Sequence, residues 1–241
     1  MKLIAKQKGF TLIEVLVVAP LMMMTIIIMM TYLFNLFGQL TQEGASLRLT
    51  TDAQLITLAL QDDIYFANAF VSTINSGLAD TYDPSGGWQY NTSPETLIIS
   101  TPALTKNNRD PDRQPVYINT EGCEPGNISN NSFLYNNIVV FVSGTNLYKR
   151  TLTAPNNIST CGTSYDKQTC PEDQSSTTCP KDILLSDKLN SFQISYFDAN
   201  NTEVAVPEQA QLIKIDVQLK DRAFADDIFG SSSISLKRLN Q

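Results

Sequence analysis

The chain of 241 residues contains no histidine, and its methionines and charges are unevenly placed. Without histidine it lacks the side chain whose ordinary pKa lies nearest neutrality, the commonest general acid and base. No glycine-rich phosphate loop follows an expected strand. Adjacent acids such as Asp62-Asp63 and Asp226-Asp227 are more typical of solvated faces than of a catalytic pair. We therefore expect a protein that is not an enzyme and needs no cofactor.

Charge is almost absent from the segment 10–37, and acidic residues outnumber basic ones over the whole chain. From Phe10 to Phe37 the one charged residue is Glu14, and all six methionines fall within the first 30 residues. The whole chain has 17 basic and 24 acidic residues, a net charge of -7. An acidic surface argues against a site for nucleic acid, whose phosphates require basic side chains.

The segment 10–37 is long and apolar enough to cross a membrane. Its 28 residues would make about 42 Å of helix, against a bilayer core of roughly 30 Å. Fifteen Leu, Ile, Val and Phe residues gain roughly 7 kcal/mol on insertion, whereas one acid costs about 3 kcal/mol. Basic residues precede the segment, which predicts a cytoplasmic N-terminus and an exported C-terminal region. These basic residues are Lys2, Lys6 and Lys8.

The sequence KQKGFTLIEVLVV, at 6–18, resembles the prepilin processing and assembly signal of type IV pilins and pseudopilins. The resemblance implies that an inner-membrane prepilin peptidase removes a leader, 1–9, by cutting between Gly9 and Phe10, and then N-methylates Phe10. Cleavage would create an amine on Phe10, which Glu14 of a neighbouring subunit would neutralise inside an apolar filament core. The implied partners are other pilin subunits, the inner-membrane assembly platform and the prepilin peptidase.

Two simpler interpretations explain less of this segment. A secretory signal peptide has a shorter apolar stretch, about 7 to 15 residues, and a small-residue cleavage site. Here the nearest such site, at 17–19, is followed by Pro20. An ordinary membrane anchor explains the length but leaves Glu14 and the Gly9-Phe10 junction to chance.

After the membrane segment the sequence becomes amphipathic. Apolar residues recur at steps of three and four from Leu49 to Ile74, as in one stripe of an α-helix. We predict one continuous helix whose amphipathic half covers 38–77. It should end near Ser76-Gly77, where glycine favours a left-handed cap.

The remainder, 78–241, has the alternation of β-strands and is expected to form an extracytoplasmic head. The runs 137–142 and 147–153 flank a turn signal, and Ile213 to Leu219 alternates most cleanly. A long helix followed by antiparallel strands predicts an α+β fold in which the sheet packs on the amphipathic half of the helix.

The order of these strands adds to the resemblance. Leu147-Tyr148-Lys149-Arg150 and the run from Phe192 to Asp198 are similar to segments of the larger minor pilins and J-type pseudopilins. The closing strand departs from that pattern by an inserted Leu239.

Four cysteines lie in or near a polar loop at 156–180. Zinc sites usually bring closely paired cysteines or histidines, and this chain has neither, so two disulfides are the favoured interpretation. Four cysteines allow three pairings, and the sequence does not choose among them. The candidates are Cys123, Cys161, Cys170 and Cys179.

One cluster of oxygen-bearing side chains could hold calcium: Asp198, Asn200 and Glu203. Asn and Asp are also favoured at hairpin tips by their turn chemistry. We favour the turn, and therefore expect no metal site.

Together these observations predict a minor pilin or pseudopilin. It would be a single-pass membrane protein that joins a filament through its N-terminal helix and exposes its head at the cell surface. A type II secretion pseudopilin or a DNA-uptake pseudopilin is an alternative within the class. The alternative outside the class is an independently anchored extracellular binding protein.

Overall fold

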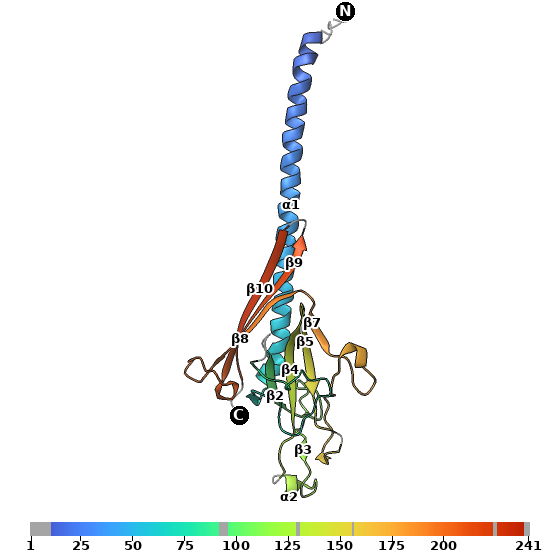
Figure 1. The fold of residues 1–241 in the computed structure, drawn as a ribbon, viewed down its shortest axis with the longest axis vertical. Coiled ribbons are helices and arrows are strands. Elements are labelled where there is room, and N and C mark those ends of the chain that lie inside the picture. Colours follow the sequence, from blue (N-terminus) through green and yellow to red (C-terminus); the bar gives the residue numbers. More distant parts are fainter. Residues whose placement is uncertain (1–10, 92–95, 129–130, 156, 224–225, 239–241) are drawn as a thin grey trace, which may run out of the picture.

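A computed structural model describes residues 11–91, 96–128, 131–155, 157–223 and 226–238. One helix, α1 (Leu12–Tyr65), dominates the molecule, and at 54 residues it is about 81 Å long. Its N-terminal part projects alone, and its C-terminal part runs into a head built of β-strands (Figure 1). The arrangement confirms the predicted α+β class, a long N-terminal helix packed on antiparallel sheets.

The end of α1 corrects the predicted boundary at residue 77. The helix stops at Tyr65, and the chain then pairs with a strand instead of making another turn: Asn68 N–H donates to the Ser100 carbonyl, and Val71 N–H to the Ile98 carbonyl. The helical spacing of apolar residues extends past Tyr65 because Val71 and Ile74 also stand at that spacing. Both residues instead pack beside a separate cluster formed by Trp88, Ile98, Val139 and Leu152.

The larger sheet has five antiparallel strands in the order β1-β2-β4-β5-β7. Its two longest strands, β4 and β5, form the predicted hairpin. Gly144 supplies the positive φ of 64° at the turn. The strands are β1 (Ala69–Phe70), β2 (Leu97–Pro102), β4 (Tyr135–Ser143), β5 (Asn146–Leu152) and β7 (Ile183–Ser186).

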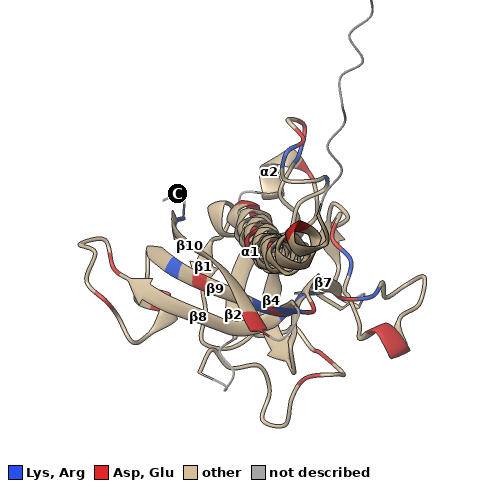
Figure 2. Cartoon of the chain, turned by 90° about the horizontal axis from the view of Figure 1, so that it is seen from above, with Lys and Arg blue, Asp and Glu red and all other residues tan. Residues whose placement is uncertain are grey.

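The second sheet has three antiparallel strands in the order β10-β9-β8, and it lies against the middle of α1 (Figure 1). In β9, Ile213, Ile215, Val217 and Leu219 are buried, so the predicted alternation is confirmed. The strands are β8 (Leu189–Phe197), β9 (Leu212–Ala223) and β10 (Asp226–Lys237). Seen along α1, β10 lies on one side of the helix and β7 on the other (Figure 2).

Smaller elements complete the end of the head that lies farthest from the N-terminus. A two-stranded sheet pairs β3 (Tyr117–Ile118) with β6 (Thr160–Cys161), next to the short helix α2 (Pro125–Ile128). Two 3-10 turns, η1 (Glu172–Gln174) and η2 (Pro207–Gln209), lie in the connections.

The strand β10 runs alongside α1 in the same direction. Gln42 Nε2 donates to Asp226 Oδ2 at 2.8 Å, and farther along the Thr57 and Ser232 hydroxyls are 3.2 Å apart. From 42 to 57 the helix rises about 22 Å, and from 226 to 232 the strand advances about 20 Å. Because these lengths are nearly equal, the strand and the helix stay in contact along this region.

The main core lies between the helix and both sheets. Leu49, Ala53, Ile56, Leu60 and Ile64 form the buried stripe of α1, as the spacing predicts. They pack with Phe70 and with residues of β2, β4, β8, β9 and β10 in one continuous cluster. The head is therefore fixed to the C-terminal half of the helix.

Candidate assembly surface

The N-terminal half of α1 has no partner within the described part of the chain. From Leu12 to Phe37 none of its side chains is buried, and Leu33 alone is half-buried. In the ranges the structure describes, α1 is the one helix long and apolar enough to cross a membrane. Membrane anchoring by a single helix is consistent with this surface.

The residues around the expected cleavage site fall partly outside the described ranges. Gly9, Phe10 and the leader residues Lys2, Lys6 and Lys8 all precede Thr11, where the description begins. The proposed cut and N-methylation therefore stay predictions.

Glu14 closes the first turn of α1. Its Oε2 atom accepts hydrogen bonds from Thr11 N–H at 2.9 Å and from Thr11 Oγ1 at 3.0 Å, while its own N–H donates to Thr11 Oγ1 at 3.3 Å. This reciprocal arrangement is a capping box, which satisfies backbone donors at a helix start. The order Thr-x-x-Glu is the sequence signal for it, and the carboxylate therefore has a role within its own chain as well as any role between chains.

The C-terminal half of α1 carries a second apolar stripe that faces away from the head. Leu47 is 70% exposed, Leu58 55% and Tyr65 46%. At 100° per residue these three side chains lie within about 20° of one another around the helix axis. The stripe also includes Leu40 and Leu55, which are 55% and 58% exposed.

This exposed stripe is opposite the core stripe. Around the axis, Leu49, Ile56 and Leu60 lie about 160° to 180° from Leu58. The helix half beyond the membrane segment is therefore apolar on two opposite faces, and the head covers just one of them. Large apolar side chains exposed along one helix face are typical of an interaction site.

A polar cleft of ≈ 540 Å³ lies beside the end of α1, and several of its charged side chains are already paired. Lys149 Nζ is 2.7 Å from Asp63 Oδ2, and Arg109 pairs with Asp62. Burial raises the pKa of the Asp63 carboxyl, and the neighbouring Lys149 ammonium partly offsets this effect. Asp63 is 8% exposed, so the expectation of a solvated face is wrong for this residue.

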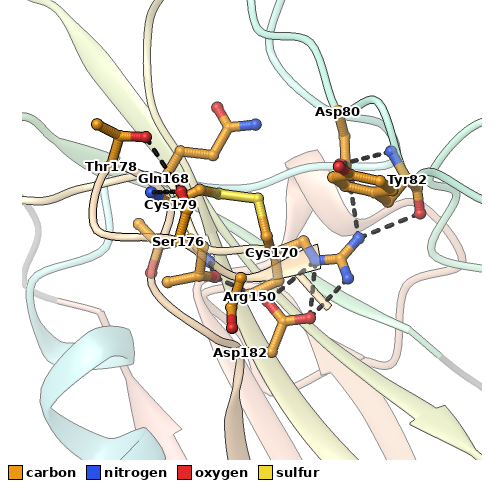
Figure 3. Close-up of a disulfide and its surroundings, with 12 residues drawn as sticks. Asp80, Tyr82, Arg150, Gln168, Cys170, Ser176, Thr178, Cys179 and Asp182 are labelled. Carbon is orange, nitrogen blue, oxygen red and sulfur yellow. Dashed lines mark hydrogen bonds and ion pairs between the residues drawn. A yellow bond between two sulfur atoms is a disulfide. The ribbon is translucent and has the colours of Figure 1, made fainter. Parts of the chain in front are cut away.

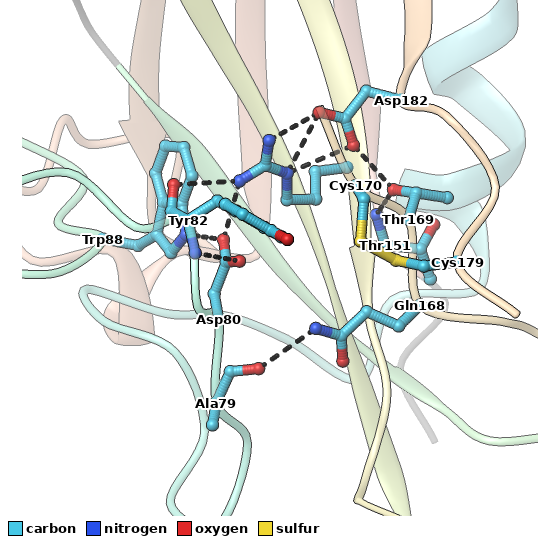
Figure 4. Close-up of polar contacts among 11 residues, drawn as sticks. Ala79, Asp80, Tyr82, Trp88, Thr151, Gln168, Thr169, Cys170, Cys179 and Asp182 are labelled. Atoms are coloured by element: carbon cyan, nitrogen blue, oxygen red, sulfur yellow. Dashed lines mark hydrogen bonds and ion pairs between the residues drawn. A yellow bond between two sulfur atoms is a disulfide. The ribbon is translucent and has the colours of Figure 1, made fainter. Parts of the chain in front are cut away.

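Arg150, one residue further along β5, sits in a buried network in the head. Its guanidinium pairs with Asp182 at 2.6 Å and with Asp80 at 2.8 Å, and Figure 4 shows both carboxylates with the neighbouring Trp88. The guanidinium also lies over the rings of Trp88 and Phe141. Burial alone would lower the pKa of Arg150, but the hydrogen bonds and charge attraction from Asp182 and Asp80 together outweigh it, so this pKa is raised. Each of the three guanidinium nitrogens of Arg150 donates to an acceptor within the head, so the network anchors the structure of the head.

The disulfide Cys170–Cys179 lies next to this anchor (Figure 3). The Cys170 backbone accepts a hydrogen bond from Asp182 N–H at 2.8 Å, which joins the small disulfide loop to the carboxylate that holds Arg150. The second disulfide, Cys123–Cys161, links the segment after β3 to β6. The structure thus pairs all four cysteines, as two disulfides require, and resolves which of the three pairings is formed.

The weak calcium candidate has the geometry of a turn. Asp198 Oδ1 accepts backbone hydrogen bonds from Asn200 N–H and Thr202 N–H, each at 2.8 Å, and Asn201 adopts a positive φ of 62°. Glu203 lies across from Phe197 in an isolated bridge. Within the described ranges, no group of three acidic, cysteine or histidine side chains is placed to hold a metal ion.

Neither the models of known protein families nor the curated proteins match this chain. The architecture, a long apolar helix packed on antiparallel sheets, is compatible with a pilin-like shape.

Proposed function

We propose that this chain is a non-enzymatic subunit of a type IV pilus or a related filament, a minor pilin or pseudopilin. In this proposal, prepilin peptidase cuts between Gly9 and Phe10, and α1 then packs against the helices of neighbouring subunits. The inner-membrane assembly platform would receive the processed subunit, and the head would face the cell exterior.

The exposed stripe on the C-terminal half of α1 carries the proposal. Leu47, Leu58 and Tyr65 lie beyond the apolar run that ends at Phe37, so lipid cannot cover them once the membrane is spanned. Burying one leucine side chain is worth about 1.5 to 3 kcal/mol. A neighbouring helix would provide that burial along the whole stripe.

The same observation favours the filament subunit over an independently anchored binding protein. A solitary anchor would keep this stripe in water, since the head packs on the opposite face. Pilus and secretion or DNA-uptake pseudopilus subunits would both bury it, and they remain alternatives within the proposal.

Replacement of one stripe residue by lysine tests the proposal. Leu58→Lys should lower the ratio of this subunit in sheared filaments to that in membranes by about tenfold or more, because a charge would enter an apolar contact. Gln39→Lys is the matched control, since Gln39 is also exposed on α1 but lies about 100° around the axis from Leu58. Equal ratios for Leu58→Lys and the control would favour the solitary anchor.

The processing step has its own measurement. The intact mass of the membrane-extracted protein should correspond to a chain that begins at a methylated Phe10. A chain that still begins at Met1, in cells with active prepilin peptidase, would contradict the assignment.

A further inference from the structure

The strand β10 is an edge strand whose outward backbone groups can be assigned from its register. In an antiparallel pair, successive residues point their N–H and C=O groups alternately toward and away from the partner strand. Arg238 N–H donates to the Gln211 carbonyl at 3.1 Å, in line with the pairing of Lys237 with Leu212. Even-numbered residues of β10 therefore face β9.

The odd-numbered residues face away from β9. The Phe229 carbonyl accepts a hydrogen bond from Ser46 Oγ of α1 at 3.1 Å, as expected for an outward group near the helix. Beyond it, Ser231, Ser233 and Ser235 are exposed, and no hydrogen bond from the described part of the chain reaches their backbone N–H or C=O groups. These groups repeat about every 6.8 Å along the strand.

Apart from the contact of α1 with the Phe229 carbonyl, this edge lacks the devices that usually protect an edge strand. Such devices include charged side chains, proline, bulges and short length. From Ile228 to Leu236 the strand has no charge and no proline, and its register with β9 is unbroken over 12 residue pairs. Asp227, near the start of the strand, is held by Lys220.

The other described edges are protected. The edge strand β1 has two residues and β7 has four. The edge of β8 is interrupted by a bulge after Leu189 and is partly covered where Val204 N–H donates to the Tyr196 carbonyl. The long open edge is thus specific to β10.

We propose that the outer edge of β10 binds an extended segment of the adjacent filament subunit by strand addition. A row of alternating donors and acceptors at this repeat is matched by the backbone of another strand. The serine side chains along this edge are neutral, so a neighbouring subunit with an acidic surface would meet no like charge there. The edge runs alongside α1, the helix that carries the exposed apolar stripe.

The identity of the partner rests on the proposed function. The experiment tests strand addition separately from the filament assignment. Ser233→Pro removes an outward N–H without breaking a bond to β9, whereas Ser233→Val changes the side chain and keeps the N–H. Ser233→Pro should lower the ratio of subunit in filaments to subunit in membranes by about fivefold or more, and Ser233→Val should not. The melting temperature of each purified full-length variant shows whether the head still folds.

A cross-link provides a second measurement if the proline variant unfolds. All four native cysteines are paired, so Ser233→Cys introduces a single free thiol that accepts a photoreactive maleimide. In sheared filaments it should cross-link to one extended segment of the adjacent subunit. Asn200→Cys, at the turn after β8, is the control and should not reach that segment.

Each outcome decides one proposal. A normal ratio for a folded Ser233→Pro variant, or no cross-link from position 233, overturns strand addition. If Leu58→Lys still lowers the ratio in that case, the filament assignment stands. If neither variant changes the ratio, both proposals fail.

Discussion

Gly230 in β10 and Leu49 in α1 lie so close that any side chain at position 230 would overlap the helix. A methyl group added there would be 2.5 Å from Leu49 Cβ and closer still to the backbone of Leu49 and Thr50. The strand passes over the helix at this point because glycine leaves the space open. Gly230 therefore sets how closely the second sheet can approach α1.

Gly230→Ala should destabilise the head. Backbone atoms cannot move aside as a flexible side chain can. The loss of unfolding free energy should therefore reach or exceed the roughly 1 to 3 kcal/mol that is typical of overpacking. Urea denaturation of the detergent-solubilised protein measures it. Gly44→Ala is the control, because that helical position is open and alanine there should stabilise by about 0.5 to 1 kcal/mol. Similar effects of the two substitutions would contradict the close approach.

Arg150→Met should cost about 3 to 5 kcal/mol of unfolding free energy. The substitution keeps an apolar stem beside Trp88 but leaves Asp80 and Asp182 buried without their cation. Lys181→Met breaks only the exposed pair with Glu172 and should cost less than about 1 kcal/mol. Chemical denaturation of both variants gives the comparison, and equal losses would show that the buried network does not anchor the head.

The carboxyl of Asp63 should make stability fall as pH rises. Its pKa in the folded protein is raised above 3.8, so the folded state binds this proton more tightly than the unfolded chain does. Relative to Asp63→Asn, the wild-type unfolding free energy should be highest below about pH 4 and decline as pH rises through the raised pKa. Lys149, Asp62 and Asp166 surround the group in both proteins.

Urea denaturation at several pH values checks this expectation. Asp62→Asn, which removes a half-exposed carboxylate at the adjacent position, controls for the loss of one negative charge. A wild-type protein that gains stability over Asp63→Asn as pH rises would mean that the ion pair with Lys149 outweighs the burial.

Glu14→Gln and Glu14→Leu separate the two roles of this carboxylate. Glutamine can keep the capping box but carries no charge, whereas leucine loses both features. If Glu14 pairs with the Phe10 amine of a neighbour, both variants should enter filaments poorly, with a loss of roughly 3 to 5 kcal/mol. The measurement is the ratio of subunit in sheared filaments to subunit in membranes.

Thr11→Ala is the control for this pair, because it removes the hydroxyl of the cap and leaves the charge. It should cost about 0.5 to 2 kcal/mol of helix stability and leave incorporation nearly normal. Wild-type behaviour of Glu14→Gln, with Thr11→Ala and Glu14→Leu equally impaired, would assign Glu14 to the helix start alone.

Local patterns predicted the elements whose side chains repeat regularly. The core stripe from Leu49 to Ile64 and the alternation of β9 both follow from one-sided burial, which the sequence records directly. The helix end was misplaced because Val71 and Ile74 satisfy helical spacing while they pack on the far side of the sheet. The spacing of apolar residues indicates which side chains are buried, but it does not show whether the backbone there is helix or strand.

The features that long-range contacts create were not predictable in this way. The Arg150 network joins segments that are 70 and 32 residues away in sequence, and the cysteine pairing depends on how β3 and β6 meet. Two other features do have a local sequence signal. Thr11 and Glu14 have capping-box spacing, and Leu47, Leu58 and Tyr65 recur at helical spacing as a second stripe.

The parallel course of β10 along α1 also determines how the molecule would respond to tension. A pull on the head along the helix axis loads the contacts from Gln42–Asp226 to Thr57–Ser232 in shear, so they resist together. A pull across the axis would peel them apart one after another. The same contacts would therefore be mechanically strong along the helix and weak across it.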